Sequence, residues 1–82
     1  MPVKMNSAIQ FKQMLMDRLS DKGVEKESIP GLIRSITICL LGNPAMNHLQ
    51  LDKELEQLGW YDIDMDYHTL QIAVTYFESK AL

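Results

Sequence analysis

The feature that most constrains this chain is a series of four stretches in which apolar residues recur at helical spacing. In the most apolar stretch, Ile29, Ile33 and Ile36 follow the 3.6-residue period of a helix rather than the alternation of a strand. Glycine and proline, which are typical of helix ends, separate the stretches. A chain of 82 residues is long enough for one modest core. We therefore predict an all-α fold, a compact bundle of four short helices in a single domain.

Local end signals set the expected bounds of these helices. Asn47 with Gln50 and Ser7 with Gln10 fit capping boxes, and Ser28 is expected to cap the second helix. Gly59 predicts a Schellman-type stop for the third helix. The predicted helices span residues 7–20, 29–41, 48–58 and 67–80. Residues 1–6 are expected to form a flexible N-terminus, and residues 7–82 the single helical domain.

Composition and charge exclude several classes of protein. A hydrophobic content of 46% and a charged content of 23% are those of an ordered globular domain. Residues 1–50 hold six Lys/Arg and four Asp/Glu, giving +2, whereas residues 51–82 hold two and seven, giving −5. Because an acidic half repels phosphate backbones, nucleic acid is not an expected partner.

The single cysteine and the distribution of apolar residues bear on location. One cysteine cannot form an internal disulfide, and MPVKMNSAIQ has no apolar core of the kind that a secretory signal needs. The run Ile29–Leu41 contains Arg34 and is shorter than the roughly 20 residues needed to cross a bilayer. We expect a soluble, cytoplasmic protein without a membrane partner.

The stretch DIDMDYHTL, residues 62–70, raises the question of a metal site. Asp62, Asp64 and Asp66 match three ligand positions of an EF-hand, but Tyr67 replaces the required glycine and Ala73 the closing glutamate. A transition-metal site of His68 with two aspartates is an alternative. We prefer a structural interpretation, in which Asp66 caps the fourth helix and a short extended segment turns its apolar residues toward the core. We therefore predict neither a metal nor a cofactor.

The chain carries no sequence signature of an enzyme. It lacks a glycine-rich phosphate loop, a GxSxG motif and an HExxH motif. Cys39 lies on the apolar stripe of the second helix, where a cysteine behaves as a small hydrophobic residue. We predict no catalytic residues and no enzymatic activity.

An atypical helix-turn-helix-like DNA-binding or transcription-associated module is the alternative function. The last two predicted helices and the turn between them would form the motif, and the fourth helix carries side chains that could reach bases, namely His68, Thr69, Gln71 and Thr75. However, the connection between these helices is about twice the usual three or four residues. Acidic residues also surround the helix that would read the bases, which weakens its attraction to a DNA backbone.

Surplus apolar residues on the second and fourth helices point to a protein–protein interaction module. Ile38, Leu41, Ile72 and Tyr76 lie off the predicted core stripes and form the predicted interaction surface, for another protein or a second copy of the chain. In the alternative arrangement, the second helix is central and covered on both sides. A metal-binding or small-ligand domain is the third function considered.

The segment LGWYDIDMDYHTLQIAVTYFE, which covers the last third of the chain, resembles the C-terminal part of small uncharacterised bacterial all-helical proteins without assigned activity. The resemblance implies a bacterial, cytoplasmic protein and carries no residue roles.

Overall fold

The structure, a computed structural model, describes residues 3–81, with side chains described for residues 8–80. Its helices are α1 (Val3–Asp21), α2 (Ile29–Gly42), α3 (His48–Gln57) and α4 (Tyr67–Ala81), and a short 3₁₀ turn, η1 (Lys26–Ser28), precedes α2. Residues 3–81 contain no strand. The predicted all-α architecture of four helices is thereby confirmed.

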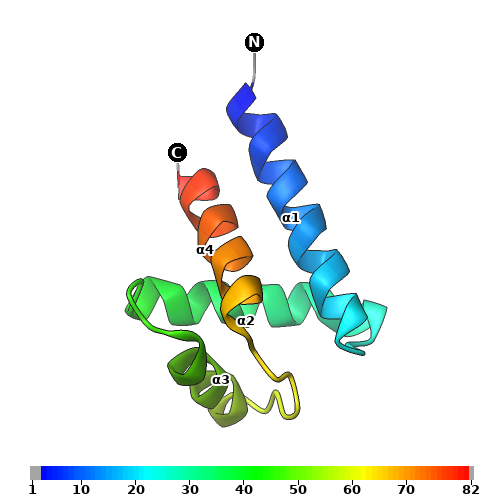
Figure 1. Cartoon of the computed structure of the whole chain (residues 1–82), viewed down its shortest axis with the longest axis vertical. Coiled ribbons are helices and arrows are strands. Elements are labelled where there is room, and N and C mark those ends of the chain that lie inside the picture. The colour runs from blue at the N-terminus through cyan, green and yellow to red at the C-terminus, as the bar shows by residue number, and fades with distance from the viewer. Residues whose placement is uncertain (1–2, 82) are drawn as a thin grey trace.

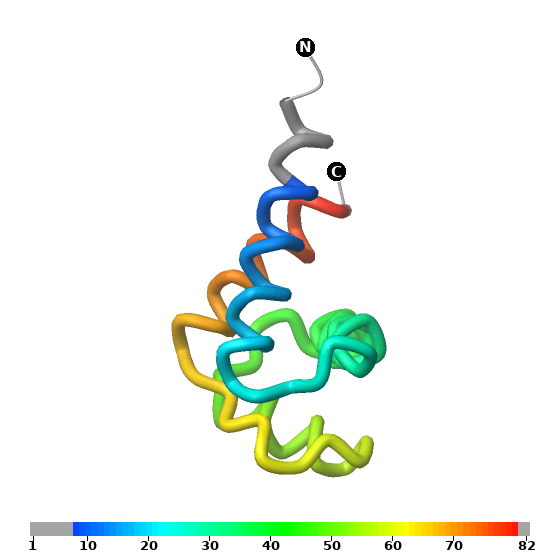
Figure 2. The backbone as a smooth tube through the Cα atoms, turned by 90° about the vertical axis from the view of Figure 1, so that its right-hand side faces the viewer, coloured from blue at the N-terminus to red at the C-terminus, as the bar shows by residue number. Residues whose placement is uncertain are grey.

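The four helices form two layers. Helices α1 and α4 lie side by side and antiparallel, and their contact is the most extensive one between any two helices (Figure 1). Helix α2 runs across behind this pair and is seen end-on in Figure 2. Helix α3 packs mainly against α2, which therefore contacts all three other helices. The exposed side of α2 is thus a separate surface from that of the α1–α4 pair.

The predicted start and stop signals of α3 are confirmed in atomic detail. At the start of α3, the Asn47 side chain accepts from the Gln50 N–H at 2.8 Å, and the Gln50 side chain accepts from the Asn47 N–H at 2.9 Å. At its end, Gly59 has a φ of 96°, and the Trp60 N–H donates to the Leu55 carbonyl at 2.9 Å, as a Schellman motif requires. Gly23 ends α1 in the same left-handed conformation, with a φ of 93°.

The predicted cap of α2 and the predicted start of α1 were wrong, although α2 begins at Ile29 as predicted. Ser28 is at the N-cap of α2 but makes no capping hydrogen bond, because η1 holds it in a helical conformation with φ −89° and ψ −18°. A serine needs an extended backbone to reach the N–H groups of the first turn. Helix α1 begins at Val3 rather than Ser7, so residues 3–6 belong to the helix. The predicted flexibility of residues 1–6 stays a prediction. Residues 1–2 lie outside the described part of the chain.

The core collects side chains from every helix. Leucines and one isoleucine from α1, α2 and α3 have almost no exposed surface. These residues are Leu15, Leu19, Leu32, Ile36, Leu40, Leu51 and Leu55. Helix α4 adds Leu70, Ala73 and Tyr76. The apolar stripes predicted for α2 and α3 therefore face the core, except at the C-terminal end of α3.

Trp60 connects the end of α3 to the first turns of α2. Its Nε1–H donates to Ser35 Oγ at 2.9 Å, and its ring lies over Gly31, where an added Cβ would be 3.6 Å from Trp60 Cζ2. This distance is an ordinary van der Waals contact. Gly31 has a negative φ and lies within a helix, where glycine is less favourable than alanine.

Gly31→Ala is therefore expected to raise the free energy of unfolding by about 0.5–1 kcal/mol, as measured by urea denaturation. Gly23→Ala is the matched control, because Gly23 has open space around its Cα but a left-handed φ. It is expected to lower stability by about 1–2 kcal/mol. A destabilised Gly31→Ala protein would mean that the contact with Trp60 is tighter than the structure shows.

Candidate interaction surface

Three large aliphatic side chains lie exposed on the C-terminal half of α2 and at the end of α3. Ile38 and Leu41 are 57% and 67% exposed, and their spacing of three residues places them on one side of α2. Leu58, the C-cap of α3, is 54% exposed and borders the same region as Ile38. We call Ile38, Leu41 and Leu58 the α2–α3 patch.

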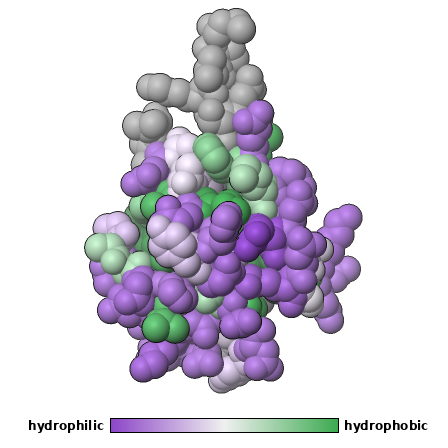
Figure 3. Space-filling model, in the orientation of Figure 1, coloured by the Kyte–Doolittle hydropathy of each residue, from purple (hydrophilic) through white to green (hydrophobic). Residues whose placement is uncertain are grey.

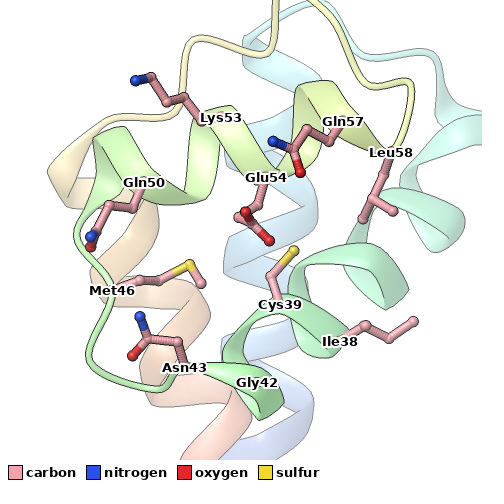
Figure 4. Close-up of a pocket in the computed structure, with 10 residues that line it drawn as sticks. All are labelled: Ile38, Cys39, Gly42, Asn43, Met46, Gln50, Lys53, Glu54, Gln57 and Leu58. Atoms are coloured by element: carbon pink, nitrogen blue, oxygen red, sulfur yellow. The ribbon is translucent and has the colours of Figure 1, made fainter.

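A groove of about 550 Å³ runs beside this patch, between α2 and α3 (Figure 4). Its apolar lining comes from Ile38, Cys39, Met46 and Leu58. Polar side chains of α3 form the opposite wall, namely Gln50, Lys53, Glu54 and Gln57. An apolar floor with a polar rim is the usual anatomy of a protein-binding site.

The groove does not offer a reactive thiol. The Cys39 thiol and the Glu54 carboxylate both point into it (Figure 4). Burial raises the pKa of the Cys39 thiol, and the negative charge of Glu54 raises it further. Since the thiolate is the nucleophile, both effects oppose reactivity at neutral pH. Cys39 therefore contributes to the groove as an apolar side chain.

The α4 half of the predicted interaction surface was wrong. Tyr76 is only 8% exposed and belongs to the core, and Ile72 is half-buried against it. The reason is that α4 packs against both α1 and α2, which together cover both of its apolar faces. Ile38 and Leu41 are exposed as expected. Leu58 follows Leu51 and Leu55 at helical spacing, which predicts a core position, yet it is exposed. Its place beside the helix-ending Gly59 was the signal that it lies at the edge.

The face seen in Figure 3, which looks onto α1 and α4, differs from this surface. It is mostly hydrophilic, and its hydrophobic areas are small and interrupted by hydrophilic side chains. Single exposed apolar residues are normal on soluble proteins, whereas adjoining ones indicate a contact surface. The α2–α3 patch, which lies next to its groove, is therefore a stronger candidate for a protein-binding surface than the face of α1 and α4.

The aspartate-rich stretch is a folded connection rather than an extended segment. Asp62 and Asp64 have φ values of 61° and 56°, the left-handed region that aspartate tolerates better than most residues. These two turns direct Ile63 and Met65 into the core, as expected. Tyr67, which was expected beside them, is instead 63% exposed.

Asp66 caps α4, as predicted, and also joins α4 to α1. Its carboxylate accepts from the Thr69 N–H at 3.3 Å and from the Thr69 hydroxyl. Lys22 Nζ lies 2.8 Å from Oδ1, and Arg18 Nη2 lies 3.2 Å from Oδ2. Desolvation raises the pKa of Asp66, but the hydrogen bonds from Lys22 and Thr69 outweigh it and hold the pKa well below its usual range. No group of three or more potential metal-binding side chains occurs within the described residues.

The arrangement of α3 and α4 does not favour the helix-turn-helix alternative. Helix α3 packs chiefly against α2 and α4 chiefly against α1, whereas the two helices of that motif pack against each other. Thr69, one of the four candidate base-reading residues, has no exposed surface. Thr75 directs its hydroxyl to the Gln71 carbonyl at 2.8 Å. His68 and Gln71 remain exposed.

No protein-family model, curated protein or solved structure matches this chain. The resemblance of its last third to small bacterial proteins therefore stays a prediction. Within residues 3–81, none of the helices combines the length and the apolar character that are needed to cross a bilayer.

Proposed function

We propose that this protein is a small protein-interaction module that binds a partner chain through the α2–α3 patch and the adjoining groove. A second copy of the chain is the partner that we put first. The observation that carries the proposal is the exposure of Ile38, Leu41 and Leu58 beside a groove whose floor is apolar. Bacterial origin and action in the cytoplasm remain part of the same proposal.

The size of the patch indicates weak association. Burying the exposed parts of three aliphatic side chains contributes about 3–5 kcal/mol, on a scale of 1.5–3 kcal/mol for a fully buried residue. In a twofold symmetric dimer both copies bury the same patch, so the gain is about 6–10 kcal/mol. The loss of translational and rotational freedom offsets at least 4 kcal/mol of this. We therefore expect a dimer that forms at high micromolar concentrations or above.

A photo-crosslinker placed in the patch tests the proposal in cells. We expect benzoylphenylalanine at position 41 to give a discrete crosslinked species, which mass spectrometry identifies as a second copy or another protein. The matched control is position 49, because Leu49 is 66% exposed, as Leu41 is, but lies outside the patch and the groove. The absence of a discrete adduct at position 41, or the same adducts at both positions, would contradict a contact surface on α2.

A further inference from the structure

A second cleft, of about 360 Å³, lies on the other side of Ile38, where α1, α2 and α4 converge. Its floor is formed by apolar side chains from all three helices: Met16 from α1, Ile29 and Ile33 from α2, and Tyr76 from α4. Three of them are buried, with 3% exposure for Ile29, 7% for Ile33 and 8% for Tyr76. The core itself therefore forms the floor of this cleft.

The rim of the cleft is cationic. Lys12 of α1, Arg34 of α2 and Lys80 of α4 line it, and none of its lining residues is acidic. Among residues with described side chains, the ion pairs go to Asp66 from Arg18 and Lys22, so none involves these three cations. Lys80 Nζ lies 5.8 Å from the centre of the Tyr76 ring, which places this charge over the edge of the floor.

This concentration of positive charge is unusual for the chain. The whole sequence has eight Lys/Arg and a net charge of −3, yet three of the eight meet at one cleft without an acidic neighbour. All three cations would attract an anion bound at this cleft. Their long side chains come from three different helices and surround an apolar floor.

From this geometry we infer that the cleft is a binding site for a free organic anion with an apolar tail, such as a fatty carboxylate. The head group would lie among Lys12, Arg34 and Lys80, and the tail would lie on Ile29, Ile33 and Tyr76. The volume is in the lower part of the range of about 300–1,000 Å³ that is common for small-ligand pockets, which often lie between helices of bundles. This small corner between three helices suits one amphiphile better than an acidic helix of a partner. The inference goes beyond the proposed protein contact, because Ile38 is the one residue of the α2–α3 patch that lines this cleft, whereas Leu41 and Leu58 do not.

Decanoate, used below its critical micelle concentration, is the probe for this site. We expect calorimetry to detect binding that weakens as salt concentration rises, because salt screens exposed charges. Decyltrimethylammonium, which has the same tail and the opposite charge, is expected to bind at least about tenfold more weakly. Amide chemical shifts should change around Ile33, Thr37 and Tyr76 rather than around the α2–α3 groove.

Two double variants distinguish the effect of the cations at the cleft on decanoate binding from the effect of the protein's net charge. Arg34→Gln with Lys80→Gln is expected to weaken decanoate binding about tenfold, because it removes two exposed charge pairs with the carboxylate. Lys26→Gln with Lys53→Gln removes the same charge away from the cleft and should leave the affinity unchanged. Thermal unfolding of both double variants checks that they remain folded.

Three results would overturn the inference. Equal binding of decanoate and decyltrimethylammonium would show that the cations do not select an anion. Binding to phosphatidylglycerol vesicles without binding to free decanoate would assign the cations to a membrane surface. Binding of an acidic amphipathic peptide, again without decanoate, would assign the cleft to a protein partner. None of these results depends on whether the α2–α3 patch binds a partner.

Discussion

Leu55→Ala is expected to lower the free energy of unfolding by about 2–5 kcal/mol, the range for large buried side chains reduced to alanine. Leu55 has no exposed surface and belongs to the core cluster that joins α3 to α2. Native domains of this size have a total stability of only about 4–12 kcal/mol. The variant is therefore expected to be partly unfolded under mild conditions, which urea denaturation followed by circular dichroism would show.

Leu49→Ala provides the control on the same helix. The chemical change is identical, but Leu49 is 66% exposed, so the expected effect is within about 0.5 kcal/mol. A similar loss of stability in both variants would mean that the faces of α3 are wrongly assigned. A near-neutral Leu55→Ala would lead to the same conclusion.

Asp66→Ala is expected to cost about 2–4 kcal/mol, which combines the loss of an N-cap with the loss of hydrogen-bond partners for Thr69, Arg18 and Lys22. Thr69 matters most among them, because its hydroxyl is buried and donates to the Asp66 carboxylate. Asp66→Asn should cost less, about 1 kcal/mol, since asparagine caps helices as well as aspartate does. Asp17→Ala, at an exposed aspartate of α1, should change stability by no more than about 0.5 kcal/mol. Equal losses of stability in the alanine and asparagine variants would show that the whole effect comes from the negative charge of the Asp66 carboxylate.

The lowered pKa of Asp66 predicts how the stability difference between the wild type and Asp66→Asn depends on pH. The pKa of a carboxyl in the unfolded chain is about 4, and the folded-state pKa of Asp66 is lower. The folded protein therefore favours the ionised carboxylate, and the stability that Asp66 contributes is fully present above pH 4. That contribution declines as pH falls below 4 toward the folded pKa. The stability difference between the wild type and Asp66→Asn should shrink between about pH 4 and pH 2. A difference that stays constant over this interval would contradict the ion pairs with Arg18 and Lys22.

Where the relevant interactions are local, the sequence predicted the structure closely. The capping box of Asn47 and Gln50 and the Schellman stop at Gly59 depend on residues within one turn of each other, and both have the predicted hydrogen bonds. The predicted cap at Ser28 was wrong because the preceding 3₁₀ turn changes the backbone conformation of this residue. No feature of the serine itself indicates this change.

Contacts between distant segments were not predictable in the same way. The sequence indicated that Asp66 caps α4, but its partners Arg18 and Lys22 are 48 and 44 positions away. Arg18 lies in the last turn of α1 and Lys22 directly follows the helix. Their spacing of four residues was the only sign in the sequence that both could reach one partner. Tyr76 was wrongly expected at the surface because one buried stripe per helix was assumed. Helix α4, however, packs against both α1 and α2, so it has two buried sides.

Sedimentation velocity of the purified protein tests the proposed role of the α2–α3 patch most directly. Between low micromolar and low millimolar concentration, we expect the wild type and Leu49→Lys to shift from monomer toward dimer. Leu41→Lys should remain monomeric, because the patch would then have to bury an ammonium group. A wild type that stays monomeric throughout, or a Leu41→Lys variant that dimerises as the wild type does, would contradict self-association through this surface.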